Sequence, residues 1–477
     1  MSAWSDISNL LLQLWPLLLG NILEWYEFSV YGYMSKVLAA NFFKGSEVGL
    51  WLGYAASFVS RPLGGLIMGA AADRYGRRPV TIVALVGMVL ATACQGLLPV
   101  VTPVCAETWR GSSIGLYILI TARLFQGIFV GGEESGVGTY LAEEAPMKRK
   151  GLATSLYFAT AFFAFLITSG LVALLYSWLG LETMNCWGWR VPFLVVLPIG
   201  AIALCGRMRV PETAAFTRQQ QQQRERRSSD RQVAAHACAV VLGCVAAGAF
   251  SALFYTSNVW CIGYLKAQGM PAEQASWLAM ANNAFLVALT PVFGMVSDRV
   301  GVGSMAVIGF LWTTIAGVPV FALLQAYSTN WLVALACLTL GFGIPIAILS
   351  ASSLLFCAEL FPTDARTLGI GLTHNLAMSL VGGSAPLAAQ ALISRVSVGP
   401  GLYISAFGLL STLTLLVALR MRARGQLQMT HLRPEPYIFQ VCCGGVVGMN
   451  DDADSEVSTD EESGRSVESS DGVASHA

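Results

Sequence analysis

Apolar runs about 20 residues long recur through most of the chain, and few charged residues interrupt them. Of the 477 residues, 55% are hydrophobic and 12% are charged, whereas a soluble domain carries roughly twice that charged share. A run of about 20 apolar residues is the length that crosses a bilayer as one helix. The runs predict an integral membrane protein with twelve transmembrane helices, at residues 9–35, 47–71, 80–101, 114–140, 152–177, 190–206, 235–263, 275–296, 304–326, 331–356, 369–394 and 401–420.

Lys and Arg are distributed unequally between the two sets of loops. With the N-terminus inside, twenty of them fall on the inner side and six on the outer side, so the positive-inside rule predicts that both termini are cytoplasmic. The formal net charge is zero because residues 450–477 hold nine acids against one base, which leaves residues 1–449 with a net charge of +8. That excess suits a protein lying beside anionic lipid headgroups.

Two motifs occur twice, once in each half of the chain. The pattern Gly-x-x-x-Asp-Arg-x-Gly begins at Gly69 and again at Gly294, and Ala-Glu-x-x-Pro begins at Ala142 and again at Ala358. The nearly equal spacing of the copies indicates a duplicated six-helix unit, the layout of many secondary transporters with a site between the halves. We therefore expect an all-α membrane protein of two pseudo-symmetric six-helix bundles.

The composition of the connecting segments divides this chain further. The polar stretch between the sixth and seventh spans predicts a linker, and the acidic, serine-rich end has the composition of a disordered segment. The predicted parts are an N-terminal bundle at 1–206, a cytoplasmic linker at 207–234, a C-terminal bundle at 235–421 and a disordered acidic cytoplasmic tail at 422–477.

The first copy of the Gly-Asp-Arg-Gly pattern continues into two more arginines. Its small residues allow helix ends to approach closely, and its aspartate can accept hydrogen bonds from a neighbouring helix end. A charge latch of this kind, closed in one conformation and open in the other, would bias an alternating-access equilibrium. Charges that only set topology would explain the arginines but not the repeated spacing. The predicted latch residues are Gly69, Asp73, Arg74, Gly76, Arg77, Arg78, Asp298 and Arg299.

At these residues the chain resembles the major facilitator superfamily, and further motifs resemble its metabolite:proton symporter family. These motifs are Gly20-Asn21-Ile22-Leu23-Glu24-Trp25-Tyr26-Glu27-Phe28, Arg61-Pro62-Leu63-Gly64-Gly65, Arg123-x-x-Gln126-Gly127, Glu359-Leu360-Phe361-Pro362-Thr363 and Gly382-Gly383-x-Ala385-Pro386. The resemblance implies the major facilitator fold with 12 transmembrane helices, and proton-coupled transport. Family members carry betaine, proline, shikimate, 2-oxoglutarate or citrate, so the resemblance implies a mechanism more than a substrate. The family usually has Asp at the position of Glu27.

Four charged side chains fall deep within the predicted helices, where a charge costs about 2.5 kcal/mol or more and is rarely without a role. Glu24 and Glu27 are three residues apart, hence on one face of the first helix, and Arg61 and Arg123 lie well inside the second and fourth. A carboxylate in a low-dielectric cavity can take up and release a proton as its exposure changes. An arginine stays charged and can hold a substrate carboxylate.

We therefore predict two kinds of site residue. The proton-coupling candidates are Glu24, Glu27 and Glu133, and the substrate-binding candidates are Arg61, Arg123, Gln126, Tyr31 and Asn375. The alternative is that the charges form permanent ion pairs between helices, for example Arg123 with an acid of the first helix. Separately, Cys105 and Cys186 both fall in predicted outer loops, where a disulfide between them is one alternative to two free thiols.

The predicted function is secondary active symport, by alternating access, of a small organic acid or zwitterion with protons. The sequence holds no complete nucleotide-binding motif and no metal-binding spacing, so we expect no cofactor, no metal, no nucleic-acid partner and no enzyme activity. The expected partners are the substrate, protons and the lipid bilayer, and the expected location is the plasma membrane. Two alternatives remain open: an uncoupled facilitator of the same fold, and a transporter-like nutrient sensor that signals through its tail.

Overall fold

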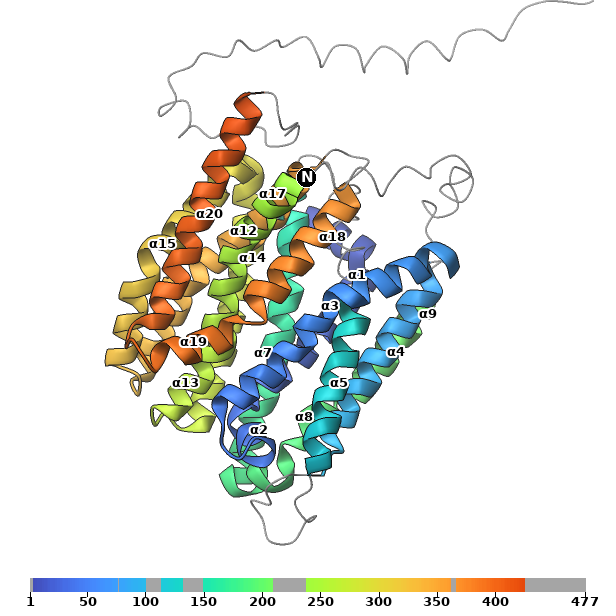
Figure 1. The fold of residues 1–477 in the computed structure, drawn as a ribbon, viewed down its shortest axis with the longest axis vertical. Helices are drawn as coiled ribbons and strands as arrows, with labels where there is room; N and C mark the ends of the chain where they lie inside the picture. The colour runs from blue at the N-terminus through green and yellow to red at the C-terminus, as the bar shows by residue number, and fades with distance from the viewer. Residues whose placement is uncertain are drawn as a thin grey trace, which may run out of the picture. The chain divides into compact units, whose positions relative to one another are not determined.

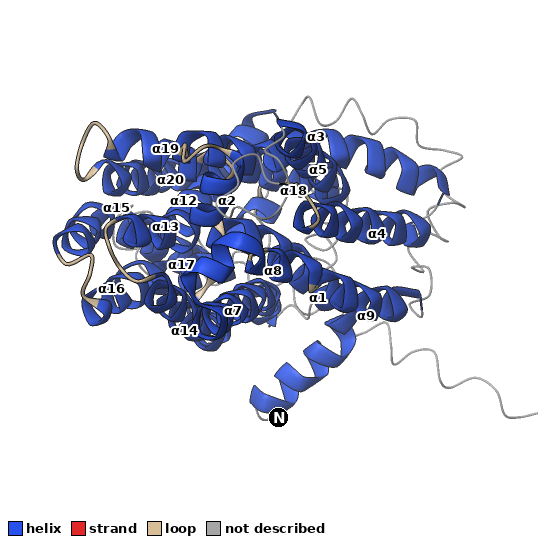
Figure 2. Ribbon diagram, turned by 90° about the horizontal axis from the view of Figure 1, so that it is seen from below, coloured by secondary structure: helices blue, strands red, loops and turns tan. Residues whose placement is uncertain are grey.

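The computed structural model describes residues 3–75, 77–99, 113–131, 149–208, 237–361 and 366–424. Within these ranges every regular element is a helix (Figure 1, Figure 2). All of them belong to one compact unit, Met1–Glu435. The all-α class predicted from the apolar runs is therefore confirmed for the described part of the chain.

The helices of the N-terminal half follow the first six predicted spans. They are α1 (Ala3–Tyr33), α2 (Ser35–Phe42), α3 (Glu47–Tyr75), α4 (Arg77–Gly96), α5 (Ser113–Gly131), α7 (Lys150–Thr183), the π-helical turn η2 (Met184–Gly188), α8 (Arg190–Leu194) and α9 (Val196–Met208). The helices of the C-terminal half follow the last six. They are α12 (Ala237–Phe254), η3 (Tyr255–Trp260), α13 (Cys261–Ala267), α14 (Ala272–Val300), α15 (Val302–Ala326), α16 (Trp331–Ala336), η4 (Cys337–Gly343), α17 (Ile344–Glu359), α18 (Arg366–Ala377), η5 (Met378–Gly382), α19 (Ala385–Ile393) and α20 (Gly399–Ala423).

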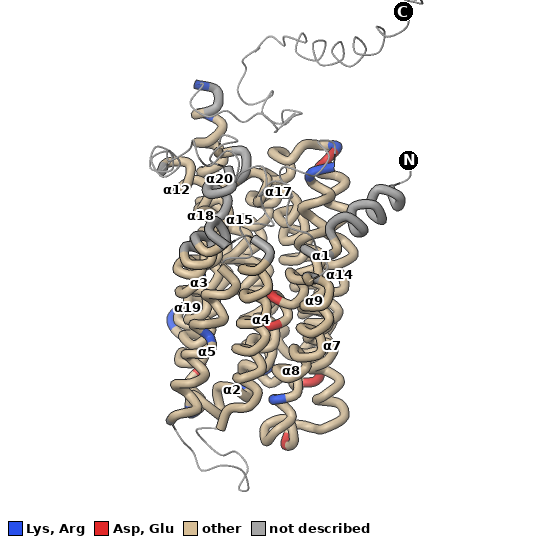
Figure 3. Tube along the Cα trace, turned by 90° about the vertical axis from the view of Figure 1, so that its right-hand side faces the viewer, with Lys and Arg blue, Asp and Glu red and all other residues tan. Residues whose placement is uncertain are grey.

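Nine segments of the described chain are long and apolar enough to cross a membrane. They coincide with the predicted third to fifth and seventh to twelfth spans. The other three predicted spans coincide with α1, with α3 and with the shorter apolar helix Arg190–Gly206. Figure 3 shows charged positions mainly near the ends of the described helices and few between those ends, as expected for segments surrounded by lipid.

Glycines set the close packing of α3 against α5. A methyl group added at Gly127 would overlap the backbone carbonyl of Ser57, and one added at Gly131 would overlap that of Arg61. Small residues at such crossings let two helix backbones approach within membranes, where packing rather than the hydrophobic effect holds helices together. The crossing fixes Arg61 on α3 beside the helix that carries Arg123.

The two halves meet along α7 and α14, which pack side by side (Figure 1). At one end of the pair, the carboxylate of Asp298 accepts hydrogen bonds from the backbone N–H groups of Gly151 at 2.7 Å and Leu152 at 3.1 Å. These groups begin α7, where backbone N–H groups have no intrahelical partner. At the other end, the hydroxyl of Ser177 on α7 donates to Oε1 of Glu273 on α14 at 2.5 Å.

The interface between the two halves is called the seam below. The end of α1 also contacts the C-terminal half, near the Glu273 end of this seam. The buried Nζ of Lys266 on α13 donates to the carbonyl of Tyr33 at 3.2 Å, and Nδ2 of Asn283 on α14 donates to the Tyr33 hydroxyl at 2.8 Å. Hydrogen bonds between the halves therefore close the seam toward both of its ends.

Candidate functional site

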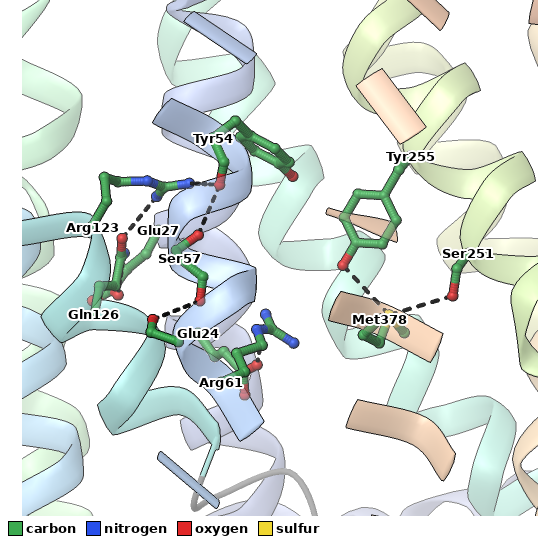
Figure 4. A network of polar contacts seen from close by, with 11 residues as sticks. Glu24, Glu27, Tyr54, Ser57, Arg61, Arg123, Gln126, Ser251, Tyr255 and Met378 are labelled. Atoms are coloured by element: carbon green, nitrogen blue, oxygen red, sulfur yellow. Dashed lines mark hydrogen bonds and ion pairs between the residues drawn. The ribbon is translucent and has the colours of Figure 1, made fainter. Parts of the chain in front are cut away.

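The four predicted intramembrane charges lie together in the N-terminal half (Figure 4). Glu24 and Glu27 come from α1, Arg61 from α3 and Arg123 from α5, and each of the four is at most 1% exposed. The spacing of three residues places both carboxylates on one face of α1, as the sequence predicted. Burial of four charges is tolerated in lipid only when they are matched with one another or with other polar groups.

Arg61 is matched with Glu24. Its Nη2 lies 3.6 Å from Oε1 of Glu24. The guanidinium also sits between two rings, with its Cζ 4.5 Å from the ring centroids of both Phe28 and Phe58. A cation over an aromatic face is attracted by the ring quadrupole, more strongly when it is desolvated. One acid and two rings thus hold the Arg61 charge inside the bundle.

Arg123 is connected to Glu27 through the side-chain amide of Gln126. Its Nη1 donates to Oε1 of Gln126 at 2.7 Å, and Nε2 of Gln126 donates to Oε2 of Glu27 at 2.8 Å. The same amide nitrogen donates to Oγ1 of Thr92 on α4 at 3.0 Å, and Nη2 of Arg123 donates to the carbonyl of Tyr54 at 3.3 Å. Gln126, predicted as a substrate contact, is therefore a bridge between the Glu27 and Arg123 charges in this conformation.

The cluster of Glu24, Glu27, Arg61 and Arg123 has no net charge when all four groups are ionised. Protonation of either glutamate leaves one guanidinium without its full counter-charge. In a site of low dielectric such an imbalance is costly, and a substrate carboxylate can correct it. The geometry therefore allows a proton and a carboxylate to bind as a pair.

Aromatic residues line the seam beside this cluster. The ring centroids of Trp25 and Phe58 lie 6.3 Å and 5.3 Å from that of Tyr255, and Tyr54 lies 6.5 Å from it. Tyr255 begins the π-helical turn η3 in the C-terminal half, and such turns are frequent at functional sites. A methyl group added at Gly382 would overlap the ring of Tyr255, and one added at Gly383 would overlap the side chain of Phe58, so the absence of side chains at these two glycines allows the close packing.

The sequence prediction missed three of these aromatic residues. Tyr54, Phe58 and Arg61 are spaced by four and three residues, so they lie on one face of α3. This helical spacing was the available signal for Tyr54 and Phe58, since an aromatic residue sharing a face with an intramembrane charge lines the same space. Trp25 directly follows Glu24, and adjacent residues do not share a helix face, so spacing gave no such signal for it.

Two further substrate candidates have different surroundings. The hydroxyl of Tyr31 donates to the carbonyl of Leu50 at 3.1 Å, and its ring lies under Arg123 with the guanidinium carbon 4.4 Å from the centroid. Tyr31 thus belongs to the cluster through its ring. Asn375 is 7% exposed and lies on α18 in the C-terminal half, whereas the four charges lie on α1, α3 and α5 of the N-terminal half.

Part of the predicted site falls outside the described structure. Glu133 and Gly76 are not among the described residues. The same is true of the side chains of the other members of the first latch motif, Gly69, Asp73, Arg74, Arg77 and Arg78. In the second copy, Asp298 binds the start of α7 as described above, whereas Arg299 is exposed. The latch role of these residues stays a prediction.

Cys186 is disulfide-bonded, while the other described cysteines are free. Its expected partner, Cys105, lies outside the described residues.

A separate cavity of about 260 Å³ lies where α2 and α3 meet α13, between Lys36, Glu47 and Trp260. None of the predicted proton or substrate residues lines it.

A family model described as "Sugar (and other) transporter" matches residues 14–240. The chain is 32% identical to the ectoine/proline transporter ProP of Corynebacterium glutamicum, over 83% of this chain and 81% of the relative. It is also 32% identical to the alpha-ketoglutarate permease of Escherichia coli, over 79% of this chain and 85% of the relative.

Solved structures of similar fold include the proton:xylose symporter XylE bound to 6-bromo-6-deoxy-D-glucose. That structure superposes with a TM-score of 0.66 at 17% sequence identity, covering 90% of this chain and 99% of the other. At this identity the likeness shows the fold alone. The predicted all-α major facilitator fold is confirmed.

Proposed function

Because this chain belongs to the metabolite:proton symporter family of the major facilitator superfamily, we propose that it carries a small zwitterion or organic acid across a membrane together with protons. The named relatives transport ectoine and proline in one case and alpha-ketoglutarate in another. The observation that carries the proposal is the buried cluster in which Glu24 meets Arg61 and Gln126 joins Glu27 to Arg123.

The charge balance of this cluster favours a zwitterion over a dianion. With both glutamates ionised the cluster is neutral, and with one protonated it carries a single positive charge. A single positive charge matches one substrate carboxylate, whereas a dianion would bring an unmatched negative charge into a dry site. A zwitterion presents that one carboxylate, and its ammonium group can lie against aromatic rings, which attract a cation but not a second carboxylate.

Coupling between the proton and the substrate follows from which loading states of the carrier leave every buried charge with a partner. In the empty carrier Arg61 is paired with Glu24 and Arg123 is joined to Glu27 through Gln126, and in the loaded carrier the substrate carboxylate takes the place of the charge lost from a protonated glutamate. A carrier holding only the proton would leave one buried guanidinium unmatched, and a carrier holding only the substrate would place its carboxylate against arginines already engaged by glutamates. Such half-loaded states are rare, so substrate and proton cross together. Glu24 and Glu27 are the proposed proton carriers, with Glu133 as a third candidate, while Arg61 and Arg123 attract the carboxylate.

Alternating access requires that the contacts between the halves open in turn. We assign the closed latch at one end to Asp298, whose carboxylate holds the start of α7 through Gly151 and Leu152. The hydrogen bonds of Ser177 and Lys266 close the other end. Breaking one set while keeping the other would expose the site to one side only. The proposed location is the plasma membrane, with both termini cytoplasmic.

The experiment is uptake into proteoliposomes that contain the purified chain. L-proline, glycine betaine and 2-oxoglutarate are offered with the outside acidic, with and without a protonophore. We expect a zwitterion to accumulate above its external concentration and the protonophore to abolish the accumulation. Uptake whose initial rate is unchanged by the protonophore would instead support an uncoupled facilitator. Deletion of residues 422–477 should leave transport intact, whereas a sensor that signals through its tail would lose its output.

A further inference from the structure

Two buried hydrogen-bond donors beside the seam have no partner within the described structure. Trp25 is 1% exposed and Tyr54 is 0% exposed, yet neither Nε1 of Trp25 nor the hydroxyl oxygen of Tyr54 makes a hydrogen bond. Buried polar groups in folded proteins are nearly always paired, because an unmade hydrogen bond forfeits the one that water would have provided. Both groups are therefore placed to donate to an acceptor that does not belong to the chain.

The two donors lie against the same ring of the opposite half. The ring of Tyr255 is 6.3 Å from that of Trp25 and 6.5 Å from that of Tyr54. Figure 4 shows the Tyr54 hydroxyl pointing from α3 toward Tyr255. An acceptor that reaches both donors would thus lie at the meeting point of α1, α3 and η3, in contact with both halves of the carrier.

The charges behind these donors favour an anionic acceptor. Cζ of Arg123 lies 5.4 Å from the ring centroid of Tyr54, and Arg61 stands over Phe58, which is one turn along α3 from Tyr54. Hydrogen bonds to a charged acceptor are shorter and roughly twice as strong as those to a neutral one. A carboxylate would satisfy both donors while facing two guanidinium groups.

We propose that the Tyr54 hydroxyl and the Trp25 indole N–H donate hydrogen bonds to the carboxylate of a small zwitterion, and that Tyr255 covers this carboxylate from the other half. The inference rests on the proposed transport function and specifies its binding site. The ammonium end lies against the rings of Tyr255 and Phe254, which meet edge to face at 5.3 Å. Arg61 and Arg123 supply the field, and the two neutral donors make the direct contacts.

The variants that test this contact remove one donor each and keep an aromatic side chain. Tyr54→Phe deletes only the hydroxyl, and Trp25→Phe deletes the indole N–H together with the ring that carries it. The matched controls are Tyr26→Phe, whose hydroxyl donates to the Pro192 carbonyl at 2.7 Å, and Trp189→Phe. Trp189 has an equally buried and unpaired Nε1, but its ring packs on Phe42 and Phe193, away from the seam.

The measurement is equilibrium exchange of labelled L-proline and glycine betaine in proteoliposomes without a pH gradient. We expect KM to rise about tenfold in Tyr54→Phe and in Trp25→Phe, with kcat within twofold of wild type, since each lost bond to a charged acceptor is worth about a factor of ten. L-prolinamide, which lacks the carboxylate, should compete poorly with L-proline in the wild type. That preference should shrink in both variants and persist in both controls.

An unchanged KM in Tyr54→Phe would overturn the proposal, as would an unchanged preference for L-proline over its amide. Tyr54→Phe decides the matter alone if Trp25→Phe fails to fold by size-exclusion chromatography. Exchange does not require a proton gradient, so a failure of proton coupling would leave the KM shift intact. A wild-type chain that exchanges neither zwitterion would overturn the assignment of the substrate class.

Discussion

Nε2 of Gln126 donates a hydrogen bond of 2.8 Å to Oε2 of Glu27, and through this bond a neutral side chain on α5 joins a carboxylate on α1 to a guanidinium on α5. Gln126 is 0% exposed, so water does not share in the connection. An amide can donate to an acid and accept from a base at the same time, which neither a hydroxyl nor an apolar residue of this size can do with the same reach.

Replacement of this bridge is therefore expected to destabilise the protein. Gln126→Leu keeps the approximate volume but leaves Glu27, Arg123 and Thr92 without their shared partner. The expected loss is about 2 kcal/mol in the free energy of unfolding, because buried groups are left unsatisfied. The measurement is the thermal unfolding midpoint in detergent. Gln126→Glu, which can still accept from Arg123, is the matched variant and should lose the donation to Glu27. A midpoint for Gln126→Leu equal to wild type would contradict the bridging role.

Removing the hydrogen bonds at one end or the other of the α7–α14 pair should shift the equilibrium between the two open conformations in opposite directions. Asp298→Ala removes the acceptor for the start of α7 and should favour opening at that end by about 1 kcal/mol, a factor of about five in population. Ser177→Ala removes the bond to Glu273 and should favour opening at the other end. Spin-label distances across each end, measured in both variants, check the prediction. Changes of the same sign in both variants would show that these bonds do not act as opposing latches.

The crossing of α3 and α5 predicts that stability depends steeply on side-chain size at Gly127 and only weakly at Gly65. Gly127→Ala would drive its methyl group into the Ser57 carbonyl, so we expect a destabilisation of about 2 kcal/mol or more and low yield of folded protein. At Gly65 the nearest atom to an added methyl, the Gly131 carbonyl oxygen, lies 3.3 Å away. Gly65→Ala should therefore be mild. Equal thermal midpoints for the two variants would contradict the packing described here.

Much of the fold could be predicted from the sequence because its main determinant is local. Span positions follow from apolar runs, and the repeated Gly-Asp-Arg-Gly spacing reports the duplication. Glu24 and Glu27 share a face through helical periodicity alone. These inferences need no knowledge of how one helix is rotated against the next, so they agree with the described helices.

The pairing within the site could not be predicted in this way. The sequence allowed Arg123 to pair directly with an acid of the first helix, whereas the described contacts join it to Glu27 through Gln126. Which partner each arginine meets depends on the rotation of α3 and α5, and that rotation is set by glycine contacts between helices. Tyr255 approaches Trp25 and Tyr54 only because the two halves dock. These contacts join residues that lie about 200 positions apart in the sequence.

The most direct test of the proposed coupling compares uphill uptake with exchange in Glu24→Gln, which mimics a permanently protonated Glu24. With an outward-acidic gradient and no membrane potential, the wild-type chain should accumulate L-proline or glycine betaine about tenfold for each pH unit if one proton moves with each zwitterion. We predict that Glu24→Gln accumulates neither but still exchanges labelled for unlabelled substrate. Glu27→Gln, measured alongside, reports whether the second acid shares the proton. Full gradient-driven accumulation by both variants would contradict the assignment of the coupling proton to α1.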